Sequence, residues 1–234
     1  MEKNNFLFLC EGYRQENYHD TLGNYKDEIV FYQDIDKLLH HCIEKPPNAV
    51  FVDLKTSMRN TSNSLLNTLY RLNMNWPVLR CNMGGDGSAS VMSIKGEDNG
   101  ESLSEVIKNI MNNDPDWSIS KINRIFMRAD VTCRIQMHKV GEKKWGLGNI
   151  TSLSSGGSYV ISYDPPDIGE TIRLKIMDIS STPIDCKGEV KWVRRWDEGT
   201  QLPGVGLTFD RRSFTSPHKK ALVEFLFNSL TKRL

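Results

Sequence analysis

The hydrophobic pattern of the chain changes its period near the middle. Up to Met111, short apolar runs typical of buried strands alternate with apolar residues at helical spacing. From Val131 onward, apolar and polar residues alternate with a period of two, which is typical of strands with one buried face. The sequence therefore predicts two regions, an α/β region followed by an all-β region.

In the first region, strands and helices are predicted to follow one another. The predicted strands are 6–10, 29–31, 49–53 and 77–79, and the predicted amphipathic helices are 38–43, 65–72 and 103–111. Alternation of this kind predicts right-handed crossovers and a parallel sheet. The segment from Gly84 to Ser90 has the composition of a loop.

The second region has the pattern of an antiparallel barrel or sandwich. Strands are predicted at 131–137, 159–161, 172–176, 190–192 and 205–209, with turn signals at 141–143, 164–166 and 196–199. Ser216 and Pro217 then predict the start of a helix, with serine as N-cap and proline at the first helical position. The apolar face of this helix would consist of Ala221, Leu222, Phe225, Leu226 and Leu230.

Charge is distributed unevenly between the two regions. The 234 residues carry a net charge of +1, but residues 1–116 hold 17 acidic and 11 basic residues, whereas residues 117–234 hold 12 and 19. The net charges are therefore −6 and +7. A basic second half favours an anionic ligand, although basic barrels are also common without one.

Composition excludes several classes of protein. No apolar run approaches the roughly 18 residues that span a membrane, and the apolar run at 6–10 is too short for a signal peptide. The five cysteines are scattered, without a CxxC pair or a Cys/His cluster, so a disulfide framework, a metal site and a cofactor are not expected. We expect reduced thiols and a cytoplasmic protein.

Two short segments carry candidate binding chemistry. Arg124 and Arg128 lie four residues apart, and residues 152–158 form a Ser/Gly-rich turn. Arginine donates in a plane to phosphate or to the O6/N7 edge of guanine. Gly156 and Gly157 would allow positive φ or close backbone approach. Together these residues are suited to a small, planar, doubly anionic ligand.

This pair of segments resembles the PilZ family of bacterial cyclic di-GMP receptors, whose motif is RxxxR followed by (D/N)xSxxG. Arg124 and Arg128 match the first part, and Ser154 and Gly157 match the second. Ser152 stands where the family has Asp or Asn, so one acceptor of the motif is missing. Two further segments, 188–193 and 204–209, resemble later strands of the family, and the resemblance covers roughly residues 120–234.

The resemblance implies a β-barrel that binds cyclic di-GMP through Arg124, Arg128, Ser152, Ser154, Gly156 and Gly157. It also implies a non-enzymatic receptor that relays the second messenger to a protein partner and controls motility, biofilm formation or polysaccharide production. We expect no DNA or RNA partner, and a homodimer is left open. The alternative is a PilZ adaptor that has lost the ligand and acts through protein contacts, since Ser152 lacks the family's carboxylate or amide.

The first region resembles a degenerate receiver domain of response regulators. Asp53 ends the third predicted strand, where that family has its phosphoacceptor. However, Glu11 is a single acid where receivers have a pair that binds magnesium, and no helix fits between Met83 and Lys95. Asp53 is therefore expected to cap a turn, and a phosphorylation-controlled protein is a third hypothesis. The predicted domains are a receiver-like domain at 1–113, a linker at 114–122 and a PilZ barrel at 123–234.

Overall fold

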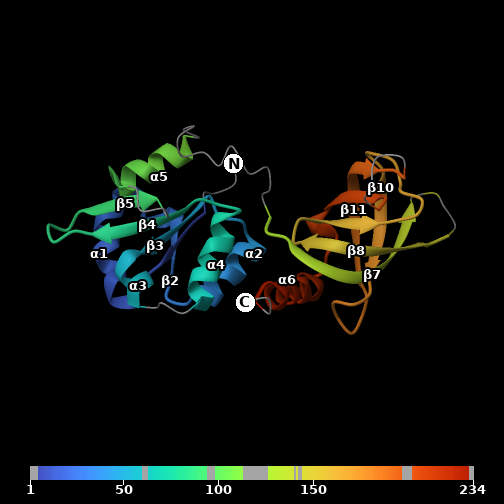
Figure 1. Ribbon diagram of the computed structural model, residues 1–234, viewed down its shortest axis with the longest axis horizontal. Helices are drawn as coiled ribbons and strands as arrows, with labels where there is room; N and C mark the ends of the chain where they lie inside the picture. The colour runs from blue at the N-terminus through green and yellow to red at the C-terminus, as the bar shows by residue number, and fades with distance from the viewer. Residues whose placement is uncertain are drawn as a thin grey trace. The chain divides into compact units, whose positions relative to one another are not determined.

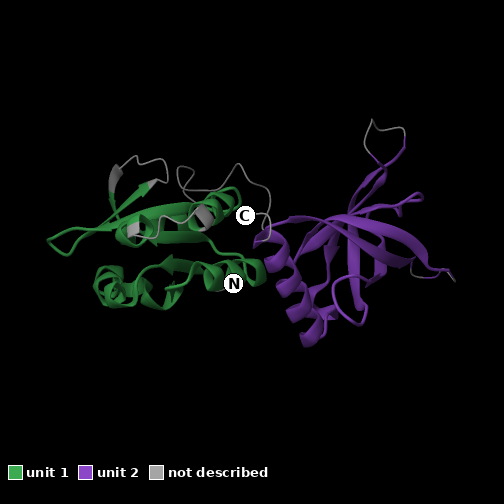
Figure 2. Cartoon of the chain, turned by 60° about the horizontal axis from the view of Figure 1, so that its bottom comes forward, with its two compact units in different colours: residues 1–125 green, residues 126–234 purple. Residues whose placement is uncertain are grey.

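The chain divides into two compact units, Met1–Ile125 and Phe126–Leu234, which Figure 2 shows in different colours. The computed structural model describes residues 5–59, 63–93, 98–112, 126–139, 141, 144–196 and 202–231. The predicted linker at 114–122 lies outside these residues, and so does Arg124.

The first unit is built on a six-stranded sheet of order β2-β1-β3-β4-β5-β6 (Figure 1). Its strands are β1 (Phe6–Leu9), β2 (Ile29–Tyr32), β3 (Ala49–Asp53), β4 (Val78–Met83), β5 (Ala89–Ser93) and β6 (Asp98–Ser102). The first four strands are parallel, as the alternating pattern predicts. The last two pair antiparallel, which makes the sheet mixed.

The hairpin of β4 and β5 occupies the segment predicted as a loop. The amide of Gly84 donates to the carbonyl of Ser88 at 2.8 Å, and Asp86 accepts hydrogen bonds from the amide and hydroxyl of Ser88. Only the turn at 84–88 is therefore irregular. Its Gly/Asp/Ser composition is that of a tight turn between two strands, not of a long loop.

Helices cover the two faces of this sheet. They are α1 (Gly12–Leu22), α2 (Ile35–Glu44), α3 (Leu54–Arg59), α4 (Asn63–Asn73), α5 (Leu103–Met111) and the 3₁₀ helix η1 (Gly23–Glu28). α1 packs beside α5, and α2 packs beside α4. The predicted helices correspond to α2, α4 and α5, whereas α1 and α3 were not predicted.

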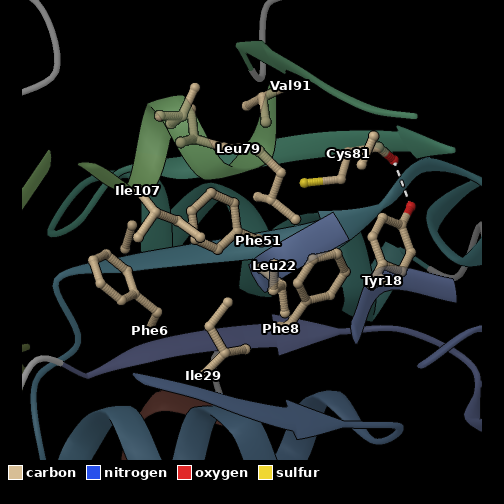
Figure 3. Close-up of a cluster of buried hydrophobic side chains, with 14 of the residues drawn as sticks. Phe6, Phe8, Tyr18, Leu22, Ile29, Phe51, Leu79, Cys81, Val91 and Ile107 are labelled. Carbon is tan, nitrogen blue, oxygen red and sulfur yellow. Dashed lines mark hydrogen bonds between the residues drawn. The ribbon is translucent and has the colours of Figure 1, made fainter. Parts of the chain in front are cut away.

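The core between the sheet and the pair α1/α5 is aromatic (Figure 3). Phe6, Phe8 and Phe51 point from β1 and β3 toward Tyr18 and Leu22 of α1, and all five side chains are fully buried. Side chains alternate between the faces of a strand, so Asp53 points to the same face as Phe51. This alternation places a carboxylate at the edge of an apolar core.

The second unit is a closed six-stranded antiparallel barrel of order β10-β11-β12-β9-β8-β7. Its strands are β7 (Ala129–Lys139), β8 (Gly146–Ser154), β9 (Gly157–Ile161), β10 (Thr171–Ile176), β11 (Ile184–Arg194) and β12 (Gly204–Phe209). The alternating apolar residues fill the interior, so the predicted all-β architecture is confirmed as a barrel. β8 was not predicted, because glycines at 146 and 148 interrupt its apolar pattern.

The helix α6 (Ser216–Thr231) follows the barrel and packs on β7. Its buried residues are Leu222, Val223, Leu226 and Leu230, close to the predicted face. The N-cap is Thr215 and not Ser216, since the Thr215 hydroxyl accepts from the amide of His218 at 3.4 Å. Among the described residues, no helix is long and apolar enough to cross a membrane.

Candidate functional site

The register of the barrel strands puts the polar residues of the predicted motif on its outer face. Asp130 on β7 pairs with Ser152 on β8, and Ser152 pairs with Tyr159 on β9. Directly opposed residues of antiparallel strands project to the same side. Asp130 is exposed and Ser152 is half-buried, whereas the next pair, Ala129 and Leu153, is buried. The row therefore lies outside the barrel.

Arg128 enters β7 beside this row. It immediately precedes Ala129, which pairs with Leu153, and its side chain is half-buried. Alternation along the strand gives Arg128 and Asp130 the same face. The structure thus brings Arg128 to the end of β8 that carries Ser152 and Ser154, so this arginine lies beside the serine turn.

Ser154 closes the turn instead of presenting its hydroxyl to solvent. Its side chain is 2% exposed. The Ser154 hydroxyl accepts from the amide of Gly157 and donates to the Gly157 carbonyl, both at 3.1 Å. That this hydroxyl contacts the ligand stays a prediction, and in this structure both of its hydrogen bonds are to Gly157. Ser154 instead fixes the turn that carries its neighbours.

The two glycines of the turn are required for close contact and not for backbone conformation. Neither is among the glycines with positive φ in the described parts of the chain. A Cβ on Gly156 would overlap the ring of Phe126, and a Cβ on Gly157 would overlap the carbonyl oxygen of Leu207. Of the two roles that the sequence suggests for them, only close approach applies.

Phe126 fastens the arginine-bearing segment to the barrel. Its ring lies on Gly156, and the Gly156 carbonyl accepts from the amide of Phe209 at 2.9 Å, which ties the turn to the end of β12. The guanidinium of Arg211 lies 5.5 Å from the centre of the Phe126 ring, within cation–π range. Phe126 and Arg211 were missed in the sequence, because only tertiary contacts join them to the motif.

An aromatic surface continues the row on the same outer face. Tyr159 pairs with Gly206, and Gly206 pairs with Trp192 on β11. The Tyr159 and Trp192 rings stack with centroids 5.0 Å apart at 10°. Arg194 lies over both rings, at 5.7 and 5.5 Å. Stacked rings beside a guanidinium form a flat platform that suits a planar ligand.

Comparison with known proteins identifies this half of the chain. The model of the PilZ domain matches residues 122–228.

Residues 122–228 are a PilZ domain. Among solved structures, the chain is similar to the Bacillus subtilis inhibitor of motility MotI/DgrA, with 18% identity, a TM-score of 0.40 and coverage of 48% of this chain and 53% of that one. It is also similar to the PilZ domain of YcgR from Escherichia coli with c-di-GMP, with 11% identity, a TM-score of 0.39 and coverage of 47% and 94%. A third is the K. pneumonia MrkH–c-di-GMP complex, with 14% identity, a TM-score of 0.39 and coverage of 47% and 53%.

The chain thus spans about half the length of the first of these proteins. No curated protein sequence matches the chain.

In the PilZ domain, Gly156→Ala is expected to lower the free energy of unfolding by about 1–3 kcal/mol, because the new methyl overlaps the Phe126 ring and forces it away. Urea unfolding followed by circular dichroism measures this loss. Gly146→Ala is the matched control, since a Cβ there meets only the Met137 carbonyl oxygen at 3.8 Å. The cost should shrink in a Phe126→Ala background. An equal cost in both backgrounds would show that the ring is not the obstacle.

Outside the PilZ domain, Asp53 is the centre of a buried polar network. Its side chain is 0% exposed. One carboxylate oxygen accepts from Arg14 Nη2 at 2.8 Å and from the Tyr18 hydroxyl at 2.6 Å. The other accepts from the amide and hydroxyl of Thr56 at 2.8 and 2.9 Å. Asp53 therefore caps the first turn of α3, in agreement with the predicted capping role.

These contacts determine the charge of Asp53. Burial alone would raise the pKa of its carboxyl, but the hydrogen bonds from Tyr18, Thr56 and Arg14 outweigh burial and lower that pKa. Burial also raises the pKa of the Cys10 thiol to about 12. Asp53 is thus held as a carboxylate beside an arginine. In the part of the chain that the structure describes, no group of three His, Cys, Asp or Glu residues could hold a metal ion.

Proposed function

We propose that this chain is a non-enzymatic receptor for cyclic di-GMP. The observation that carries the proposal is the meeting of Arg128 with the turn at 152–157 on the outer face of a PilZ barrel. The PilZ resemblance implies this ligand, and an arginine fork suits its phosphates and guanine edges. Arg124 completes the proposed site but lies outside the described residues. Ser152, Gly156 and Gly157 line the turn, while Ser154 holds it closed.

Within this proposal, the receptor relays ligand level to a protein partner in the bacterial cytoplasm. The process would be motility, biofilm formation or polysaccharide production. Residues 1–113 would form a receiver-like domain that no longer accepts phosphate, joined by a linker at 114–122 to the barrel at 123–234. Burial of Asp53 behind Arg14 and Tyr18 supports the loss of phosphorylation, because a phosphoacceptor must reach its phosphoryl donor.

One observation favours a second candidate function. Ser152 carries neither a carboxylate nor an amide. An adaptor that has lost cyclic di-GMP and acts only through protein contacts would tolerate this change. The two candidates differ in a single measurable property, which is ligand binding by the purified protein.

Calorimetric titration of the full chain with cyclic di-GMP tests the proposal. We expect saturable binding that weakens as salt is added, because arginine–phosphate contacts are screened. GTP and cyclic AMP serve as controls for general nucleotide binding. Absence of heat and of any change in melting temperature with cyclic di-GMP would favour the adaptor.

A further inference from the structure

Asp130 faces Ser152 across the barrel ladder, at the one motif position where the sequence departs from the PilZ pattern. The two residues are directly opposed on β7 and β8. Both therefore project from the outer face, and the Asp130 side chain is exposed. Cβ atoms of opposed residues lie about 4.5–5.5 Å apart. A carboxylate on β7 can thus reach the space that a longer side chain at Ser152 would occupy.

The chemistry that Ser152 lacks is that of a double acceptor. The Watson–Crick edge of guanine presents two neighbouring donors, N1–H and the N2 amino group. An ionised carboxylate accepts hydrogen bonds at both oxygens and donates none, whereas a serine hydroxyl is a single, shorter group. Charge-assisted hydrogen bonds of this kind are about twice as strong as neutral ones.

We propose that Asp130 supplies the acceptor for a guanine edge, in place of the residue missing at position 152. This inference rests on the proposed cyclic di-GMP binding. Arg128, two residues earlier on the same face, engages the phosphates or the other guanine edge. In this arrangement the acceptor comes from β7 and not from the β8 position where the family has Asp or Asn.

The sign of the mutational effect separates this role from that of an ordinary surface charge. An acid that merely lies near a doubly anionic ligand repels it, so its removal tightens binding. An acid that accepts from guanine attracts the ligand, so its removal weakens binding. Asp130→Ala is therefore expected to lower cyclic di-GMP affinity about ten- to a hundredfold.

The facing pair also changes the effect expected of a variant that restores the family's acid at position 152. Restoring the family residue with Ser152→Asp alone suggests tighter binding. In the structure it places two carboxylates directly opposite each other, which is unfavourable. We expect Ser152→Asp to bind no tighter than the parent, and the exchange Asp130→Ser with Ser152→Asp to bind more tightly than Asp130→Ala.

The experiment titrates cyclic di-GMP and cyclic di-AMP into the parent, the two single variants and the exchange variant. Asp185→Asn is the matched control, since Asp185 is an acid on β11 whose ion-pair partner, Arg173 at 2.6 Å, lies away from the row. Adenine lacks the N1–H and N2 donors. Asp130→Ala should therefore lose preference for the guanine ligand, while the control should keep both affinity and preference.

Two results would overturn the inference alone: a parent that binds with Asp130→Ala equal or tighter, or a Ser152→Asp variant that binds more tightly than the parent. A parent that does not bind cyclic di-GMP overturns the proposed function, and the inference with it.

Discussion

Arg128→Ala is expected to abolish cyclic di-GMP binding or to weaken it at least about 30-fold. Truncating one member of a charged, hydrogen-bonded pair costs about 2–5 kcal/mol, and 2 kcal/mol corresponds to roughly 30-fold in Kd. Arg128 stands where β7 begins, next to the serine turn, so no other residue of that strand can present a guanidinium at this position. Calorimetric titration of the full chain measures the loss.

Two companion variants sharpen this prediction. Arg134→Ala removes an exposed arginine further along β7 that pairs with Asp178 at 2.5 Å, and it should leave affinity within about threefold, since such surface pairs contribute little. Arg128→Lys keeps the charge but loses the planar fork, so it should fall between the parent and alanine. Binding by Arg128→Ala at parental affinity would remove the proposed site. Arg124→Ala is expected to act in the same direction.

Arg14→Met is expected to lower the free energy of unfolding by about 3–5 kcal/mol, the usual cost of leaving one partner of a buried ion pair without the other. Arg14 and Asp53 are 6% and 0% exposed, and the Asp53 carboxylate would keep three donors but lose its counter-charge. Urea unfolding of the full chain measures the change, with the two units allowed to unfold separately.

Replacing both Arg14 and Asp53 tests whether the loss of stability comes from the unpaired charge of Asp53. Asn at position 53 can still cap α3 through Thr56 without a negative charge. Arg14→Met combined with Asp53→Asn should therefore be more stable than Arg14→Met alone. Arg173→Met, which breaks the exposed pair with Asp185, is the matched control and should cost less than about 1 kcal/mol. An Arg14→Met protein as stable as the parent would contradict the account.

The same network predicts a dependence on pH. The pKa of the Asp53 carboxyl is lower in the folded protein than in the unfolded chain. Its contribution to stability is therefore present above the unfolded pKa of about 3.9 and is lost as the pH falls toward the folded value. Unfolding free energies measured from pH 7 down to 3 should show a fall below about pH 4 in the parent. The Arg14→Met, Asp53→Asn protein should lack that component.

The sequence by itself determined those strands and helices in which apolar residues recur at one regular spacing. β3 and α5 agree with their predicted bounds, because a short apolar run that ends at an acid indicates a buried strand and a 3.6-residue apolar stripe indicates an amphipathic helix. The change of period also determined the division into an α/β half and an all-β half. The local turn chemistry located the Ser/Gly turn of the candidate site.

Elements were missed where polar residues interrupt or replace the hydrophobic pattern. The inward face of α1 consists of Arg14, Tyr18 and Leu22, and a buried arginine is indistinguishable in sequence from an exposed one. β6 (Asp98–Ser102) is polar throughout, so its pairing with β5 has no hydrophobic signature. For α1, the partner that makes burial of Arg14 favourable is Asp53, which lies 39 residues away in the chain.

Only the tertiary structure decided how the candidate site is assembled. The pairing of Asp130 with Ser152 depends on a strand register interrupted by a bulge between Asp130 and Cys133, and one residue of slip would send these side chains to the other face. The packing of the Phe126 ring on Gly156 joins residues 30 positions apart in the sequence. The hydrogen bond from the Ser154 hydroxyl to the Gly157 carbonyl is local, but the residue types of the turn do not specify it. Sequence patterns record which residues prefer burial, whereas the register and close contacts that bring side chains together arise only when the barrel closes.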